Sequence, residues 1–169
     1  MSHEQFHRLR LEWYRAEVAR PADPFSAWVW SFAQPSETMQ DARVALREQP
    51  QDVPVSHALS RTIRMDEAVG RTLVLAERAS EGLGYLEHAL QSCAATDYPI
   101  QYVRAYLDKA VGLEQTGKVQ DACQAYRKVL DFWATAERSV SVRAAKRGLV
   151  RNNCDEVLAP RAIGASTAK

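Results

Sequence analysis

The sequence predicts an all-α protein built from antiparallel helical hairpins, and three observations lead to this prediction. Apolar residues recur at helical spacing, as at Phe6, Leu9 and Trp13, and no stretch alternates apolar and polar residues long enough to form a sheet. Glycine and proline are scarce, with 7 of each, whereas alanine, leucine and arginine are abundant. The 169 residues, of which 46% are hydrophobic, can bury one core and are too few for two large domains.

Proline-rich breaks divide the predicted helices into groups. A first helix over 4–19 stops at 21–24, which holds two prolines. A helix with Ser36 as its expected N-cap follows and stops at 49–54, where two more prolines lie. We therefore expect three parts: an N-terminal helical segment over 1–54, helical repeats with a capping helix over 55–158, and a flexible tail over 159–169.

The second half has the more regular helical pattern. Short breaks separate segments of helical periodicity over 67–76, 80–92, 100–115, 119–135 and 139–151. Ser56 can cap an additional helix that begins before the first of these. Gly70 weakens the middle of such a helix, so whether it runs unbroken to Ala76 is left open.

One stretch of the second half is repeated about forty residues later. The earlier copy reads AERASEGLGYLEHAL and the later copy reads EQTGKVQDACQAYRKVL. In the later copy Gly117 ends one helix, Ala122 allows close packing of the next, and Tyr126 fills the space between them. The corresponding residues of the earlier copy are Glu77, Gly82 and Leu86.

This order of turn glycine, small residue, aromatic residue and apolar pair resembles a tetratricopeptide repeat. Residues 76–154 resemble more specifically the tetratricopeptide-like C-terminal region of many myxobacterial proteins, including some serine/threonine kinases. The residues that carry the resemblance lie at 86–90, 93, 122–126, 129–130, 133, 138–140, 144–145, 147 and 154. The resemblance implies a short solenoid of stacked antiparallel hairpins and an interaction or scaffolding role rather than a reaction.

The family pattern also implies where a partner binds, because the first helix of each repeat lines a concave surface. The residues that it places there are Arg64, Arg71, Val74, Arg104, Leu107, Val111 and Glu114. Some family members bind a peptide carboxylate with a set of lysine and asparagine side chains, which is absent at these positions, so that ligand is not expected. An ordinary solvated helix face is the alternative interpretation of these residues.

An aromatic run near the N-terminus is the second candidate for partner binding. Four large rings, including Trp28 and Trp30, fall within 25–32, which is more than one buried face requires. Exposed aromatic side chains mark interfaces with a partner or with a second copy of the same chain. Packing of this run against the repeats would explain the same residues.

His3, Glu4 and His7 form an HExxH pattern, which on a helix can bind zinc with the glutamate as a general base. The pattern lies at the end of the chain, where a helix frays, and no third ligand is evident downstream. We therefore expect a polar first turn, and no metal, cofactor or catalytic residue. An N-terminal zinc hydrolase remains the alternative function.

Charge and hydropathy bear on location and partners. The chain has 22 basic and 21 acidic residues, a net charge of +1, and therefore no overall attraction to nucleic acid or an anionic membrane. The helix expected over 139–151 is basic but lacks aromatic residues for base stacking. No apolar run is long enough for a signal peptide or a membrane span. These features predict a cytoplasmic protein that binds neither nucleic acid nor a membrane.

The cysteines allow two interpretations. Cys93, Cys123 and Cys154 lie about 30 residues apart, a spacing that fits neither a metal knuckle nor a redox motif. They can be buried free thiols, which behave as small apolar side chains. A disulfide between Cys123 and Cys154 is the other interpretation, and it would contradict a reducing cytoplasm.

The predicted function is that of a non-catalytic adaptor, which binds another protein through its groove or its N-terminal aromatic surface. A homo-oligomeric structural subunit is a further alternative to the zinc hydrolase. The resemblance supplies a surface but does not name the partner.

Overall fold

The computed structural model describes residues 5, 8, 9, 12, 16, 36–47, 63–91, 98–133, 135, 136 and 138–157. All regular structure in this part of the chain is helical, as predicted. The HExxH pattern, the aromatic run over 25–32, the expected boundary at 54 and the tail over 159–169 lie outside the described residues.

The helices agree closely with those expected for the second half of the chain. They are α3 (Met39–Arg47), α4 (Ile63–Leu75), α5 (Ala79–Gln91), α6 (Pro99–Gln115), α7 (Val119–Trp133), α8 (Val140–Arg151) and α9 (Cys154–Val157). Helix α4 runs through Gly70 without a break, and it begins four residues before the expected 67. Ser56, the expected cap of an earlier helix, lies outside the described residues.

The N-cap expected for α3 is wrong, because Thr38 occupies that position. The backbone N–H of Asp41 donates to Thr38 Oγ1 at 3.2 Å, and the N–H of Thr38 donates to Asp41 Oδ2 at 2.9 Å. This reciprocal pair satisfies two amides at the start of the helix. Ser36 is instead buried, with its hydroxyl 3.2 Å from that of Thr72 on α4. It joins the two helices rather than capping one.

The two antiparallel hairpins, α4–α5 and α6–α7, have turns of the same type. Each turn holds one residue in the left-handed region, Glu77 with a φ of 64° and Gly117 with a φ of 75°. The N–H of this residue donates to the carbonyl three residues back, and the next N–H donates to the carbonyl five residues back. This pair of bonds is the Schellman arrangement that ends a helix. Glu77 therefore occupies the place of the turn glycine, as the sequence comparison predicted.

A third residue in the left-handed region follows α8. Asn153 has a φ of 49°, and its N–H donates to the carbonyl of Val150 at 3.2 Å. Helix α9 follows directly at Cys154. The α8 helix, expected from the sequence as a capping helix, is thus followed by a left-handed residue and the short helix α9.

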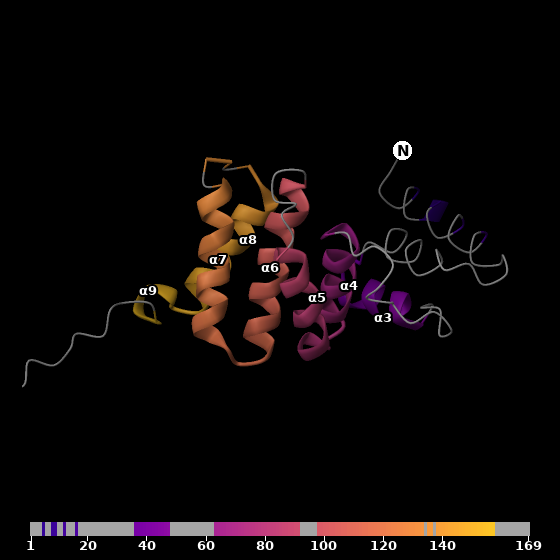
Figure 1. Ribbon diagram of the computed structural model, residues 1–169, viewed down its shortest axis with the longest axis horizontal. Helices are drawn as coiled ribbons and strands as arrows, with labels where there is room; N and C mark the ends of the chain where they lie inside the picture. Colours follow the sequence, from indigo (N-terminus) through magenta and orange to yellow (C-terminus); the bar gives the residue numbers. More distant parts are fainter. Residues whose placement is uncertain are drawn as a thin grey trace, which may run out of the picture.

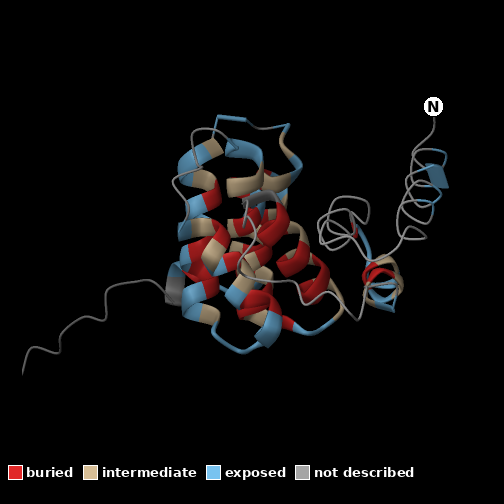
Figure 2. Ribbon diagram, turned by 45° about the vertical axis from the view of Figure 1, so that its right-hand side comes forward, coloured by how far each residue is buried: buried red, intermediate tan, exposed pale blue. Residues whose placement is uncertain are grey.

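Successive helices pack on one another along the chain, from α4 to α8, and α3 packs on α4 (Figure 1). Contacts also join helices two apart, α4 with α6 and α6 with α8. The first helices of successive hairpins therefore lie on a common side. Buried residues concentrate between the helices, and exposed residues cover the outer faces and turns (Figure 2).

Small residues set the distance between helices at two places. A Cβ at Gly70 of α4 would lie 2.6 Å from Leu86 Cγ, and a Cβ at Gly82 of α5 would lie 2.8 Å from the Gly70 carbonyl oxygen. Between α7 and α8, a Cβ at Gly148 would lie 2.4 Å from Tyr126 Cζ. The helices come this close only because these positions lack a side chain.

In the part of the chain that the structure describes, no helix combines the length and the apolar character needed to cross a bilayer.

Candidate functional site

A cleft of about 370 Å³ lies where α4, α6 and α8 meet. Helix α6 contributes Arg104, Leu107, Asp108 and Val111, whose spacing places them on one helical face. Helix α8 contributes Val140, Ser141, Ala144, Arg147 and Arg151, which also follow helical spacing. Arg71 of α4 and Tyr126 of α7 complete the lining.

Four of the residues that the family pattern placed on a concave surface lie together in this cleft, namely Arg71, Arg104, Leu107 and Val111. Val74 does not, because it is 1% exposed and packs in the core, where its Cγ2 would lie 3.1 Å from a Cβ at Gly112. The expectation that Val74 faces a partner is therefore wrong. The side chain of Arg64, and Trp28 and Trp30 as a whole, lie outside the described residues.

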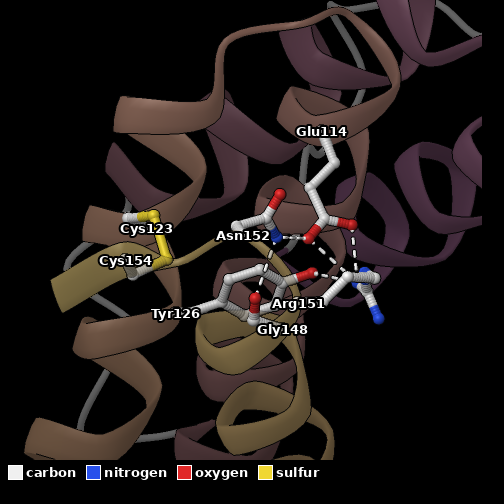
Figure 3. A network of polar contacts seen from close by, with 7 residues as sticks. All are labelled: Glu114, Cys123, Tyr126, Gly148, Arg151, Asn152 and Cys154. Atoms are coloured by element: carbon white, nitrogen blue, oxygen red, sulfur yellow. Dashed lines mark hydrogen bonds and ion pairs between the residues drawn. A yellow bond between two sulfur atoms is a disulfide. The ribbon is translucent and has the colours of Figure 1, made fainter. Parts of the chain in front are cut away.

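Glu114 belongs to a polar network beside the cleft (Figure 3). Its carboxylate accepts hydrogen bonds from Arg151 Nη2 at 2.6 Å and from the side-chain amide of Asn152. Arg151 also donates to the Tyr126 hydroxyl at 3.4 Å, and burial raises the pKa of Tyr126 above its usual value. The network joins the C-terminal ends of α6 and α8, so Glu114 fixes the position of α8 beside the cleft.

The α8 side of the cleft was not anticipated from the sequence. The arginines of this helix were interpreted as the solvated face of a cap, but Arg147 and Arg151 line the cleft. A left-handed residue, Asn153, follows α8, as Glu77 and Gly117 follow α4 and α6, the other two helices that meet at the cleft.

A group of charged side chains lies where α4 meets α6. Arg71 Nη1 lies 3.2 Å from Asp108 Oδ1, and Arg71 Nε donates to the Ser36 carbonyl at 2.8 Å. Glu67 is 6% exposed, and its Oε1 has no hydrogen-bond partner among the described residues. Burial, together with the charge of Asp108, raises the pKa of Glu67 to about 7. Arg71 thus pairs with one buried carboxylate, while the second is partly protonated near neutral pH.

The remaining guanidinium groups of the cleft differ in their partners. Arg151 is engaged by Glu114, as described above. Arg104 and Arg147 are exposed, and within the described residues neither makes a hydrogen bond or an ion pair. Arg104 lies on α6 and Arg147 lies on α8. These two groups are available to an anionic group of a ligand.

A disulfide joins Cys123 of α7 to Cys154 of α9, with a Cα–Cα distance of 5.5 Å. Both cysteines are buried, at 0% and 1% exposure. The interpretation of these two as free thiols is therefore wrong, although their burial was expected. The turn at Asn153 precedes α9, which packs on α7 and so brings Cys154 next to Cys123. Cys93 lies outside the described residues.

The described lining of the cleft consists of arginine, aspartate, aliphatic, tyrosine and serine side chains. The described residues contain no group of three side chains suited to hold a metal ion. What the cleft presents is an apolar surface bordered by guanidinium groups.

No family model, no curated protein and no solved structure matches this chain. The resemblance to tetratricopeptide proteins therefore depends on the sequence motifs quoted above.

Proposed function

We propose that the protein is a non-catalytic, tetratricopeptide-like adaptor that binds another protein in the cleft between α4, α6 and α8. The observation that carries this proposal is the meeting of Arg71, Arg104, Leu107 and Val111 in one cleft. All four are residues that the tetratricopeptide-like pattern of the sequence predicts for a concave binding surface. Their convergence supports a binding surface over a set of unrelated solvated positions.

The composition of the cleft supports the same proposal. Arginine is enriched at protein interfaces because its planar group donates several hydrogen bonds while its stem packs on apolar neighbours. Val140 is 69% exposed beside this cleft, which leaves a large apolar side chain in water. A bound partner would cover this surface and the neighbouring Leu107.

Affinity capture from the source lysate tests the proposal when the wild type is compared with an Arg104→Ala/Arg147→Ala variant. The matched control is Lys109→Ala/Arg143→Ala, which removes the same charge from the same two helices outside the cleft lining. We expect a partner that the wild type and the control retain and the cleft variant loses. A partner retained equally by all three proteins would exclude the cleft as its binding site.

The location of the protein is part of this proposal, because the disulfide opposes the cytoplasmic location that the sequence suggests. Structural disulfides persist in oxidising compartments, whereas most cytosols keep thiols reduced. Alkylation of free thiols during lysis distinguishes an oxidising location from the cytoplasm. Cys123 and Cys154 that escape alkylation because they form a disulfide would indicate an oxidising location, and alkylated Cys123 and Cys154 would support the cytoplasm.

A further inference from the structure

We infer that the segment bound in the cleft is an acidic internal stretch of a partner protein, with a carboxylate between Arg104 and Arg147 and an apolar side chain beside it. The inference rests on the proposed function and adds the chemistry of the partner. Four arginines line the cleft, and two of them are paired with carboxylates in the described part of the chain.

The balance of charge favours an anionic ligand. Arg71 is paired with Asp108 and Arg151 with Glu114, so these two guanidinium groups are neutralised within the protein. Arg104 and Arg147 have no such direct partner in the described part of the chain. Arg104 does interact at longer range with Glu67 and Asp108. Because Glu67 has a pKa of about 7, a substantial fraction of it is neutral at physiological pH, and it opposes an incoming carboxylate only in part.

The apolar residues of the cleft specify a second feature of the ligand. Leu107 and Val111 lie on the α6 side, and Val140 and Ala144 lie on the α8 side. Burial of an aliphatic side chain of the ligand against such a surface favours binding. A ligand that carried charge alone would leave this surface in water, so the preferred segment combines aspartate or glutamate with leucine, isoleucine, valine or phenylalanine.

The size and composition of the cleft favour a peptide over nucleic acid. Its volume of about 370 Å³ is at the lower end of the range for ligand sites, roughly 300–1,000 Å³, and accommodates a few side chains. Tyr126 is the one aromatic residue of the described lining, and it is 1% exposed, so no ring is available for base stacking.

Selection from a displayed random peptide library, with peptides fused at their C-termini so that no free carboxyl terminus is presented, tests the inference on the full chain. We expect the wild type to enrich peptides that combine acidic and apolar residues. These peptides should bind an Arg104→Gln/Arg147→Gln variant about tenfold more weakly, as expected when charge-assisted hydrogen bonds are lost. The Lys109→Gln/Arg143→Gln control should bind them as the wild type does, and added salt should weaken the binding.

Three outcomes would overturn the inference. They are enrichment of peptides without an acidic bias, equal binding by the cleft variant, and tighter binding of a single-stranded oligonucleotide than of any selected peptide. Failure to enrich any peptide counts against it as well. If the lysate partner still depends on Arg104 and Arg147 in that case, the cleft remains the binding site and only the acidic chemistry of the ligand is wrong.

Discussion

At the scale of single residues, Gly148 is the described glycine with the least room for a side chain, because an added Cβ would lie 2.4 Å from Tyr126 Cζ. The ring of Tyr126 is 1% exposed and occupies the space in which a side chain at position 148 would lie. Leu86 has the corresponding role in the first hairpin, where it meets Gly70. The α4–α5 hairpin and the contact between α7 and α8 thus each depend on one large side chain packed against a glycine.

This packing predicts the effect of a single methyl group. Gly148→Ala should destabilise the protein by about 1–3 kcal/mol, because the new Cβ would overlap Tyr126 and force a shift in a buried contact. Urea denaturation measures the change. Gly84→Ala is the control, since a Cβ there meets nothing within 4 Å, and it should stabilise the protein by about 0.5–1 kcal/mol through helix propensity. Equal stability of Gly148→Ala and the wild type would disprove the close contact.

At the scale of elements, the turns of the first two hairpins differ in the residue that occupies the left-handed position. Glu77 pays a steric penalty that Gly117 avoids. We expect Glu77→Gly to raise the free energy of unfolding by about 1 kcal/mol and Gly117→Glu to lower it by a similar amount. The ion pair between Glu77 and Arg43 is exposed and offsets little of the first change. Thermal denaturation of both variants checks the prediction, and two changes of the same sign would contradict it.

The disulfide is the second feature that belongs to the scale of elements. It closes a loop with a sequence separation of 31 residues, for which loop entropy predicts a stabilisation of about 3–4 kcal/mol. Reductant should therefore lower the denaturation midpoint of the wild type. A Cys123→Ser/Cys154→Ser variant should start at the lower midpoint and show no response to reductant. A midpoint that is unchanged by reductant in the wild type would show that α9 gains no stability from this bond.

At the scale of the whole molecule, the buried Glu67 predicts how stability depends on pH. Its pKa is raised from 4.5 to about 7 on folding, so the folded state holds its proton more tightly than the unfolded state does. The stabilising effect is present at low pH and is lost as the pH rises from about 4.5 through 7, with an upper limit of about 3 kcal/mol. Burial of Asp108 raises its pKa in the same direction, while Arg71 and Arg104 oppose both shifts.

A Glu67→Gln variant isolates this contribution. Relative to the wild type, it should gain stability as the pH rises from about 4.5 to about 7 and level off above that, which urea denaturation at several pH values would measure. Glu81→Gln serves as the comparison, because Arg78 lowers the pKa of Glu81 at the surface and any difference there should be small and of opposite sign. A gap between Glu67→Gln and the wild type that stays constant with pH would mean that Glu67 is ionised in the folded protein.

The contrast between prediction and structure is clearest at particular residues. Gly117 and Glu77 were placed correctly in turns, because helix ends are encoded by short-range spacing and backbone preference. Val74 was assigned to a surface and lies in the core, since a family pattern sets a position along the repeat and not the distance to the neighbouring hairpin. The α8 arginines were missed for the same reason.

The sequence by itself determined the helices of the second half and their repeated turns. Helix formation depends on residues a few positions apart, and those relations are visible in the chain. Only the tertiary structure decided that Arg104 and Arg147 share a cleft, that Glu67 is buried beside Asp108, and that Cys123 reaches Cys154. These meetings depend on how closely the helices pack, which small residues at Gly70, Gly82 and Gly148 control through contacts far apart in the sequence.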